Sequence, residues 1–259
     1  MKSLSKIFAL AAHAFKELVR KKDFYVFLFL FLGLVFFFYN ESFFGMRGVS
    51  RYLKDIGFSL ITLFSIIIAV SFAAKQIPSE IESKTIYPLL AKPVSRTHLI
   101  LGKFLGSFFI SGIAFTAFYL IYLSFIFARG EAANAVLLAQ SYLFSIFLLG
   151  LLSAIAVFFS LFFTVAANLT VTLLLYFFIY WYNGILRELI LSSPKTLSRL
   201  YGALYYLLPH FEFYDTRIRL VHLWDPLPAW VVISVFIYTL IYISLMIWAA
   251  CSVFKRKSL

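Results

Sequence analysis

Residues 80–106 read EIESKTIYPLLAKPVSRTHLILGKFLG and form a segment, punctuated by polar residues, between two long apolar runs. Pro78, just before this stretch, can open a helix and Pro93 can end one, because proline lacks a backbone N–H and has a fixed φ. Apolar residues between the two prolines recur near the helical period. The pattern predicts a short amphipathic helix on the cytoplasmic surface, a turn at residues 92–95, and a helix that returns to the membrane from about Thr97.

Composition indicates that most of the chain lies in lipid. The 259 residues are 63% apolar and only 13% charged, whereas soluble domains have about 25% charged residues. The net charge of +12 comes from basic residues at the ends of apolar runs, which is the pattern of membrane orientation, so we expect no nucleic-acid partner. Cys251 is the only cysteine, which excludes an internal disulfide and a cysteine metal cluster.

The apolar runs predict an all-α membrane protein with six transmembrane helices, formed by a single domain over residues 1–259. The predicted spans are residues 24–39, 56–74, 105–128, 135–163, 165–191 and 229–254. A basic, amphipathic pattern over residues 1–23 predicts an interfacial helix, with a solvated start to the first span as the alternative. Residues 75–104 form the predicted cytoplasmic segment, and residues 192–228 form an external helical segment.

The distribution of basic residues predicts that both termini are cytoplasmic. Fourteen of the 23 lysines and arginines fall on the proposed inner side and nine on the outer side, and cytoplasmic loops carry the excess in membrane proteins. The fourth and fifth spans are expected to join at a small internal turn near residues 166–168.

The chain shows no energy-coupling chemistry of its own. Its only Gly-Lys pair is Gly102-Lys103, and the position five residues before that glycine is Thr97, so a GxxxxGK phosphate loop cannot form. The predicted spans contain almost no charged residue, which argues against a proton- or sodium-coupled carrier. Neither a nucleophile–base pair nor paired carboxylates lie at membrane depth, so we expect no enzymatic activity and energy supplied by a partner.

The external segment predicts a tyrosine-rich helix on or in the outer leaflet, which ends at Pro209. Its residues form either a substrate exit or a lid that only covers the spans. The candidate exit residues are Tyr201, Tyr205, Pro209 and Phe211.

Four polar residues of the same segment could be drawn together as a metal site, but their spacing matches no helix-borne ligand motif. They are His210, Glu212, Asp215 and His222. Ordinary loop polarity is the preferred interpretation, and we expect neither a metal nor a cofactor on this chain.

Several motifs resemble the ABC type-2 permeases of bacteria. They are EIESKT at 80–85, LLAKPVSR at 89–96 and LGK at 101–103, with Ser83-Lys84 in place of the family's usual Ser-Gly before the threonine. Lys16-Glu17 with Arg20, and LLPHF at 207–211, are weaker matches to the family's start and to its external Leu-Pro element. With six predicted spans and no nucleotide loop, the resemblance covers nearly the whole chain.

The resemblance implies a permease subunit in the bacterial inner membrane that pairs with itself or a related permease. It also implies a separate dimeric ATPase subunit that carries ATP and Mg²⁺ and docks on the cytoplasmic segment. The implied coupling residues are Glu80, Ile81, Glu82, Lys84, Thr85, Ile86, Leu89, Pro93 and Arg96. Alternatively, their charges only mark the membrane–water boundary.

The expected function is therefore ATP-driven export of a lipid, a lipid-linked glycan or another amphipathic substrate. A related alternative is a permease that supports maturation of a metalloenzyme outside the membrane, as in nitrous-oxide reductase assembly. A third is a scaffold that anchors an ATPase and transmits its conformational change without moving a substrate.

Overall fold

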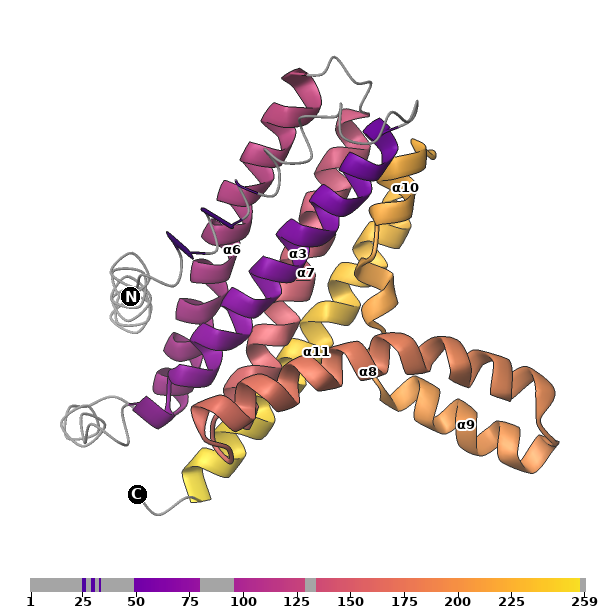
Figure 1. The fold of residues 1–259 in the computed structure, drawn as a ribbon. Coiled ribbons are helices and arrows are strands. Elements are labelled where there is room, and N and C mark those ends of the chain that lie inside the picture. The colour runs from indigo at the N-terminus through magenta and orange to yellow at the C-terminus, as the bar shows by residue number, and fades with distance from the viewer. Residues whose placement is uncertain are drawn as a thin grey trace.

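The computed structural model describes residues 25–26, 29–30, 33, 49–79, 96–128 and 134–256 (Figure 1). Within these residues the ordered elements are helices, and no strand occurs. They are α3 (Val49–Lys75), α6 (Arg96–Ala128), α7 (Ala135–Phe159), α8 (Val165–Ser192), α9 (Lys195–Leu207), the 3₁₀ helix η2 (Phe211–Tyr214), α10 (Arg217–His222) and α11 (Ala229–Arg256).

Five of these helices, α3, α6, α7, α8 and α11, are long and apolar enough to cross a membrane. The all-α, multi-pass membrane architecture is thereby confirmed. The predicted interfacial helix at 1–23 lies outside the described residues. The amphipathic helix predicted between Pro78 and Pro93 also lies outside them, apart from residues 78 and 79. Only five residues of the predicted span at 24–39 are described, so the count of six spans stays a prediction.

Helix boundaries differ from the sequence expectation in two places. The helix predicted from about Thr97 begins at Arg96, as expected. The helix of the second predicted span, α3, begins at Val49 and not near residue 56, so the last part of the stretch between the first two predicted spans is helical. The break between the fourth and fifth spans lies at residues 160–164, earlier than the predicted turn at 166–168. Asn168 instead lies inside α8, where its buried Nδ2 donates to the Ala156 carbonyl of α7 over 2.9 Å. The same carbonyl accepts from the Ser160 backbone N–H over 2.9 Å, so the Asn168 amide adds a second bond there and ties the start of α8 to the end of α7.

The core lies where α3, α6 and α7 pack together, with α11 along α7 (Figure 1). Phe115, Phe118 and Phe144 are fully buried there. The ring of Phe115 lies 5.5 Å from that of Tyr119 and 5.6 Å from that of Tyr142, distances typical of favourable aromatic pairs. This interlocked aromatic layer fixes α6 against α7.

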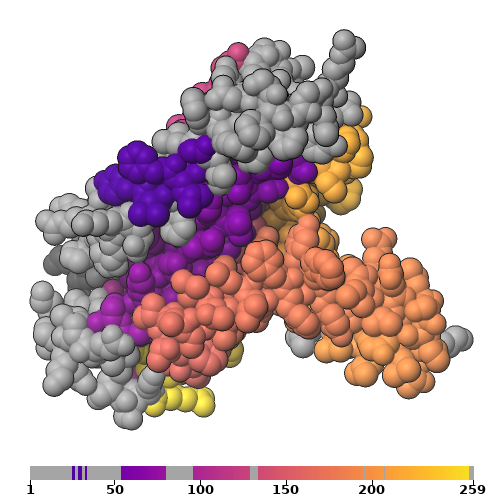
Figure 2. Space-filling model, in the orientation of Figure 1, coloured from indigo at the N-terminus to yellow at the C-terminus, as the bar shows by residue number. Residues whose placement is uncertain are grey.

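In contrast, α8 leaves the bundle. Its first half packs on α3 and α7, whereas its second half pairs with α9. The two form a hairpin that projects to the side in Figure 1 and stands out as a separate lobe in Figure 2. The chain then returns through η2 to α10, which packs on α3. The tyrosine-rich helix predicted before Pro209 is confirmed as α9, but it lies along α8.

Buried Gln140 of α7 fixes the end of this return path. Its Nε2 donates to the Leu227 carbonyl over 2.7 Å, and its Oε1 accepts from the Leu227 N–H over 2.9 Å. The pair anchors the segment that leads from α10 into α11.

We expect Gln140→Leu, which keeps the size of the side chain, to lower the free energy of unfolding by about 2 kcal/mol, because it leaves both Leu227 backbone groups without a partner. Thermal unfolding in detergent measures the change, with Ser234→Ala on the exposed side of α11 as the control. An unfolding temperature equal to that of the unsubstituted chain would contradict the anchoring role.

Candidate functional site

A pocket of about 340 Å³ opens between α3, α7, α8 and the segment from η2 to α10. Ile66 of α3 and both Ser145 and Leu148 of α7 line it, and seven of its fifteen lining residues are aromatic. Volumes of roughly 300–1,000 Å³ are typical of sites for small organic ligands. The aromatic residues lining it are Phe58, Tyr176, Phe177, Tyr180, Trp181, Phe211 and Tyr214.

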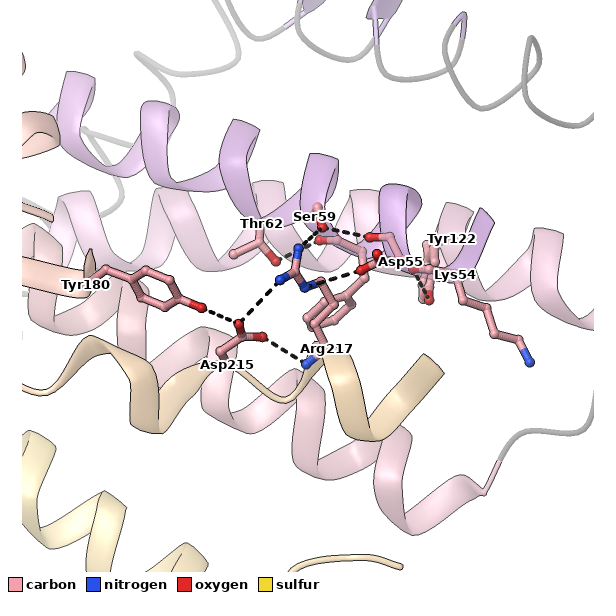
Figure 3. A network of polar contacts seen from close by, with 9 residues as sticks. Lys54, Asp55, Ser59, Thr62, Tyr122, Tyr180, Asp215 and Arg217 are labelled. Atoms are coloured by element: carbon pink, nitrogen blue, oxygen red, sulfur yellow. Dashed lines mark hydrogen bonds and ion pairs between the residues drawn. The ribbon is translucent and has the colours of Figure 1, made fainter. Parts of the chain in front are cut away.

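A network of charges lies beside this pocket, centred on the Arg217 guanidinium (Figure 3). Arg217 Nε lies 3.2 Å from Asp55 Oδ1, and Arg217 Nη2 lies 3.9 Å from Asp215 Oδ2. Arg217 Nη1 also donates to Ser59 Oγ over 3.2 Å. Two carboxylates thus share one guanidinium, and the group as a whole carries one unit of negative charge.

Asp215 is held from two elements. The Tyr180 hydroxyl of α8 donates to Asp215 Oδ2 over 2.6 Å, and the Arg217 backbone N–H donates to Oδ1 over 3.0 Å. The network therefore joins α3, α8 and the start of α10. The side chain of Lys54, although adjacent in sequence to Asp55, points away from the network in Figure 3.

A second polar cluster joins α8, η2 and α11. Nδ2 of buried Asn183 donates to Glu212 Oε2 over 2.8 Å, and His210 Nδ1 lies 3.1 Å from Glu212 Oε1. The Tyr238 hydroxyl of α11 accepts from the His210 backbone N–H over 2.8 Å. Burial would raise the pKa of Glu212, but the hydrogen bonds from His210 and Asn183 outweigh it and hold this pKa below its ordinary value. The cluster fixes the base of the α8–α9 hairpin.

The lowered pKa of Glu212 predicts a pH effect on stability. A carboxyl with a lower pKa in the folded state stabilises the fold above its ordinary pKa, and this contribution is lost as the pH falls through the folded-state value. We expect the unfolding temperature to fall less steeply below pH about 5 in Glu212→Gln than in the unsubstituted protein. Asp225→Asn, outside the cluster, is the matched control, and identical pH profiles for Glu212→Gln and the unsubstituted protein would contradict the assignment.

Three of the four candidate exit residues meet at the junction of α9 and η2. Phe211 is 1% exposed, and its ring centre lies 5.1 Å from that of Tyr176. The Pro209 carbonyl accepts from Asn183 Nδ2 over 3.4 Å. The ring of Tyr205 lies 4.3 Å from the imidazole of His210, and burial raises the pKa of the Tyr205 hydroxyl.

Tyr201 lies one turn earlier on α9. Of the four, only Phe211 lines the pocket.

Among the candidate coupling residues, only Arg96 lies within the described part of the chain. Its Nη1 donates to the Phe254 carbonyl over 2.8 Å and to the Lys255 carbonyl over 3.2 Å, and its guanidinium lies 5.6 Å from the centre of the Phe254 ring. Arg96 therefore caps the last turn of α11, where a cation is favourable to the helix dipole. The other eight coupling residues, at positions 80–93, lie outside the described residues.

The four polar residues considered for a metal are separated by the fold. His210 and Glu212 meet each other, Asp215 pairs with Arg217, and the ring of His222 stacks 6.0 Å from that of Trp224. In the part of the chain that the structure describes, no three or more ligating side chains gather.

Sequence reasoning missed Asp55, Tyr180 and Arg217. The one signal for Asp55 was a carboxylate one turn before Ser59 at the start of an apolar run. Nothing in the sequence indicated its partner, Arg217.

A family model described as ABC-2 family transporter protein matches residues 8–259. No curated protein matches the chain.

Proposed function

Because this chain belongs to the ABC-2 transporter family and is thereby the permease subunit of an ABC transporter, we propose that it exports an amphipathic substrate. A lipid, a lipid-linked glycan or another molecule with an apolar body and a polar head fits this proposal. The observation that supports it most is the pocket between α3, α8 and the η2–α10 segment, which combines aromatic walls with a charged group beside them.

The proposal assigns energy coupling to a separate ATPase subunit. The chain has no GxxxxGK loop, and such a loop forms the phosphate cradle of P-loop ATPases. An ATPase dimer that closes on ATP and Mg²⁺ would push on residues 80–95, which connect α3 to α6, and so shift these two helices relative to each other. Two permease copies in the bacterial inner membrane would complete the assembly.

ATP turnover separates an exporter from a scaffold. The assembly of permease and ATPase is reconstituted in vesicles, and ATP hydrolysis is measured against a series of lipids and lipid-linked glycans. We expect at least one class to change the turnover about twofold or more, because substrate binding alters the permease that the ATPase must move. Turnover that no amphipath changes would favour the scaffold.

Orientation is tested by cysteine labelling with a membrane-impermeant reagent in a Cys251→Ala background. We expect Asp225→Cys, after α10, to react from outside intact cells, and Ser79→Cys, after α3, to react only after lysis. The opposite pattern would contradict cytoplasmic termini. Tyr206→Cys, at a side chain 80% exposed on α9, reports whether that helix reaches the outer aqueous phase.

A further inference from the structure

We propose that the pocket between α3, α7, α8 and η2 binds an amphipathic organic cation, whose positive charge lies near Asp215 and Asp55 and whose apolar body lies against the aromatic walls. That this ligand is also the transported substrate rests on the proposed function. Binding itself requires only the permease.

The charge balance at the pocket favours a cation. Asp55 and Asp215 compete for the single guanidinium of Arg217, at 3.2 Å and 3.9 Å. Arg217 thus leaves one negative charge uncompensated among the described residues of the network. Beside an apolar pocket this charge is screened less than in water, so its attraction for a cation is larger.

Asp215 is the carboxylate best placed to meet the ligand, since it lines the pocket and Asp55 does not. Its side chain is 22% exposed, so it is accessible from the cavity. The Tyr180 hydroxyl donates to its Oδ2, and the Arg217 backbone N–H donates to its Oδ1. A carboxylate offers about four acceptor positions, which leaves room for a further positive group.

The aromatic walls add a second, independent preference for a cation. Tyr176, Tyr180, Phe211 and Tyr214 line the same pocket as Asp215. The faces of aromatic rings carry partial negative charge and attract organic cations, most strongly where water is excluded. Phe211 and Tyr214 are 1% and 2% exposed, so the protein holds these rings in place.

An anionic head group is disfavoured by the same geometry. Among the residues that the structure describes, Arg217 is the only basic one that lines the pocket, and its guanidinium already contacts Asp55, Asp215 and Ser59. A phosphate could approach it only beside two carboxylates. The pocket is therefore expected to bind amphipathic cations more tightly than amphipathic anions, whereas a site for anionic lipids would have the opposite preference.

The test uses two probes of nearly equal size and shape, tetraphenylphosphonium and tetraphenylborate. Their binding to the purified permease in nanodiscs is measured by calorimetry, with empty nanodiscs subtracted. We expect tetraphenylphosphonium to bind saturably and tetraphenylborate to bind at least about tenfold more weakly. Equal binding of the two ions, or no saturable binding of the cation, would overturn the proposal.

Substitutions locate the binding site. Asp215→Asn is expected to weaken tetraphenylphosphonium binding about tenfold or more, and Asp55→Asn to weaken it less, because Asp55 acts through Arg217. Asp225→Asn, the same change outside the pocket, should leave binding unchanged. Unfolding temperatures show whether each variant is folded. If Asp215→Asn fails to fold, Phe177→Leu replaces it as the test, because it removes one aromatic ring from the pocket lining and should also weaken binding. Unchanged binding in folded Asp215→Asn would contradict the site.

These measurements need neither nucleotide nor ATPase. A permease that binds the cation but is not driven by ATP would refute the proposed function and leave the binding site intact. A permease that is driven by ATP but binds no cation would refute the binding site and leave the proposed function intact.

Discussion

Phe211→Ala is expected to lower the free energy of unfolding by about 3 kcal/mol and to abolish ligand binding in the pocket. Phe211 is 1% exposed, packs against Tyr176 and forms one wall of the cavity. Its removal leaves a cavity where η2 meets α8, and the surrounding helices can fill that space only in part. Thermal unfolding and tetraphenylphosphonium binding, both in nanodiscs, measure the two effects.

Phe213→Ala is the matched control, two residues further along η2. Phe213 is 43% exposed and does not line the pocket. We expect it to cost about 1 kcal/mol, mainly from its ring contacts with His210 and Tyr238, and to leave binding unchanged. Equal effects of the two substitutions would show that Phe211 has no special role in the pocket.

The second large effect is expected on the cytoplasmic side. Glu82→Ala should reduce the amount of ATPase that is recovered with the purified permease about tenfold. This reduction is equivalent to roughly 1.4 kcal/mol of binding free energy. Glu82 belongs to the charged part of the proposed docking segment. Arg96→Ala is expected to act differently, because Arg96 caps α11 within the chain. It should lower stability by about 2 kcal/mol, through loss of two charge-assisted hydrogen bonds, while the ATPase is still recovered.

Arg96→Lys distinguishes the two roles further. Lysine keeps the charge but not the planar guanidinium, whose Nη1 donates to both carbonyls and which lies beside the Phe254 ring, so we expect a stability between those of arginine and alanine. Equal loss of the ATPase in Arg96→Ala and Glu82→Ala would instead assign Arg96 to the docking surface.

The sequence predicted the parts of the fold that depend on local pattern. Long apolar runs identified the five spanning helices within the described residues, and the helical pattern of the external segment before Pro209 identified α9. Both signals follow directly from helix geometry and the thickness of the bilayer. The motif resemblance agreed with the family model over residues 8–259.

The candidate site was less predictable because its charges come together only in the folded chain. Asp55 and Arg217 are separated by more than 150 positions, and their contact depends on α10 packing against α3. The turn between α7 and α8 was displaced for a similar reason. A side-chain amide of Asn168 reaches back to Ala156, so a residue typical of turns lies inside a helix. Arg96, read as a docking charge, caps a helix 158 residues away.

Transport in vesicles shows whether a separate nucleotide-hydrolysing subunit drives this permease. Tagged permease is isolated from its own membranes together with any ATPase that accompanies it, and ATP-dependent movement of a fluorescent amphipathic cation across the vesicle membrane is measured. We expect movement that requires ATP and stops when the P-loop lysine of the ATPase is replaced. Movement at the same rate by the permease alone, or isolation of the intact permease with no nucleotide-hydrolysing subunit, would contradict it.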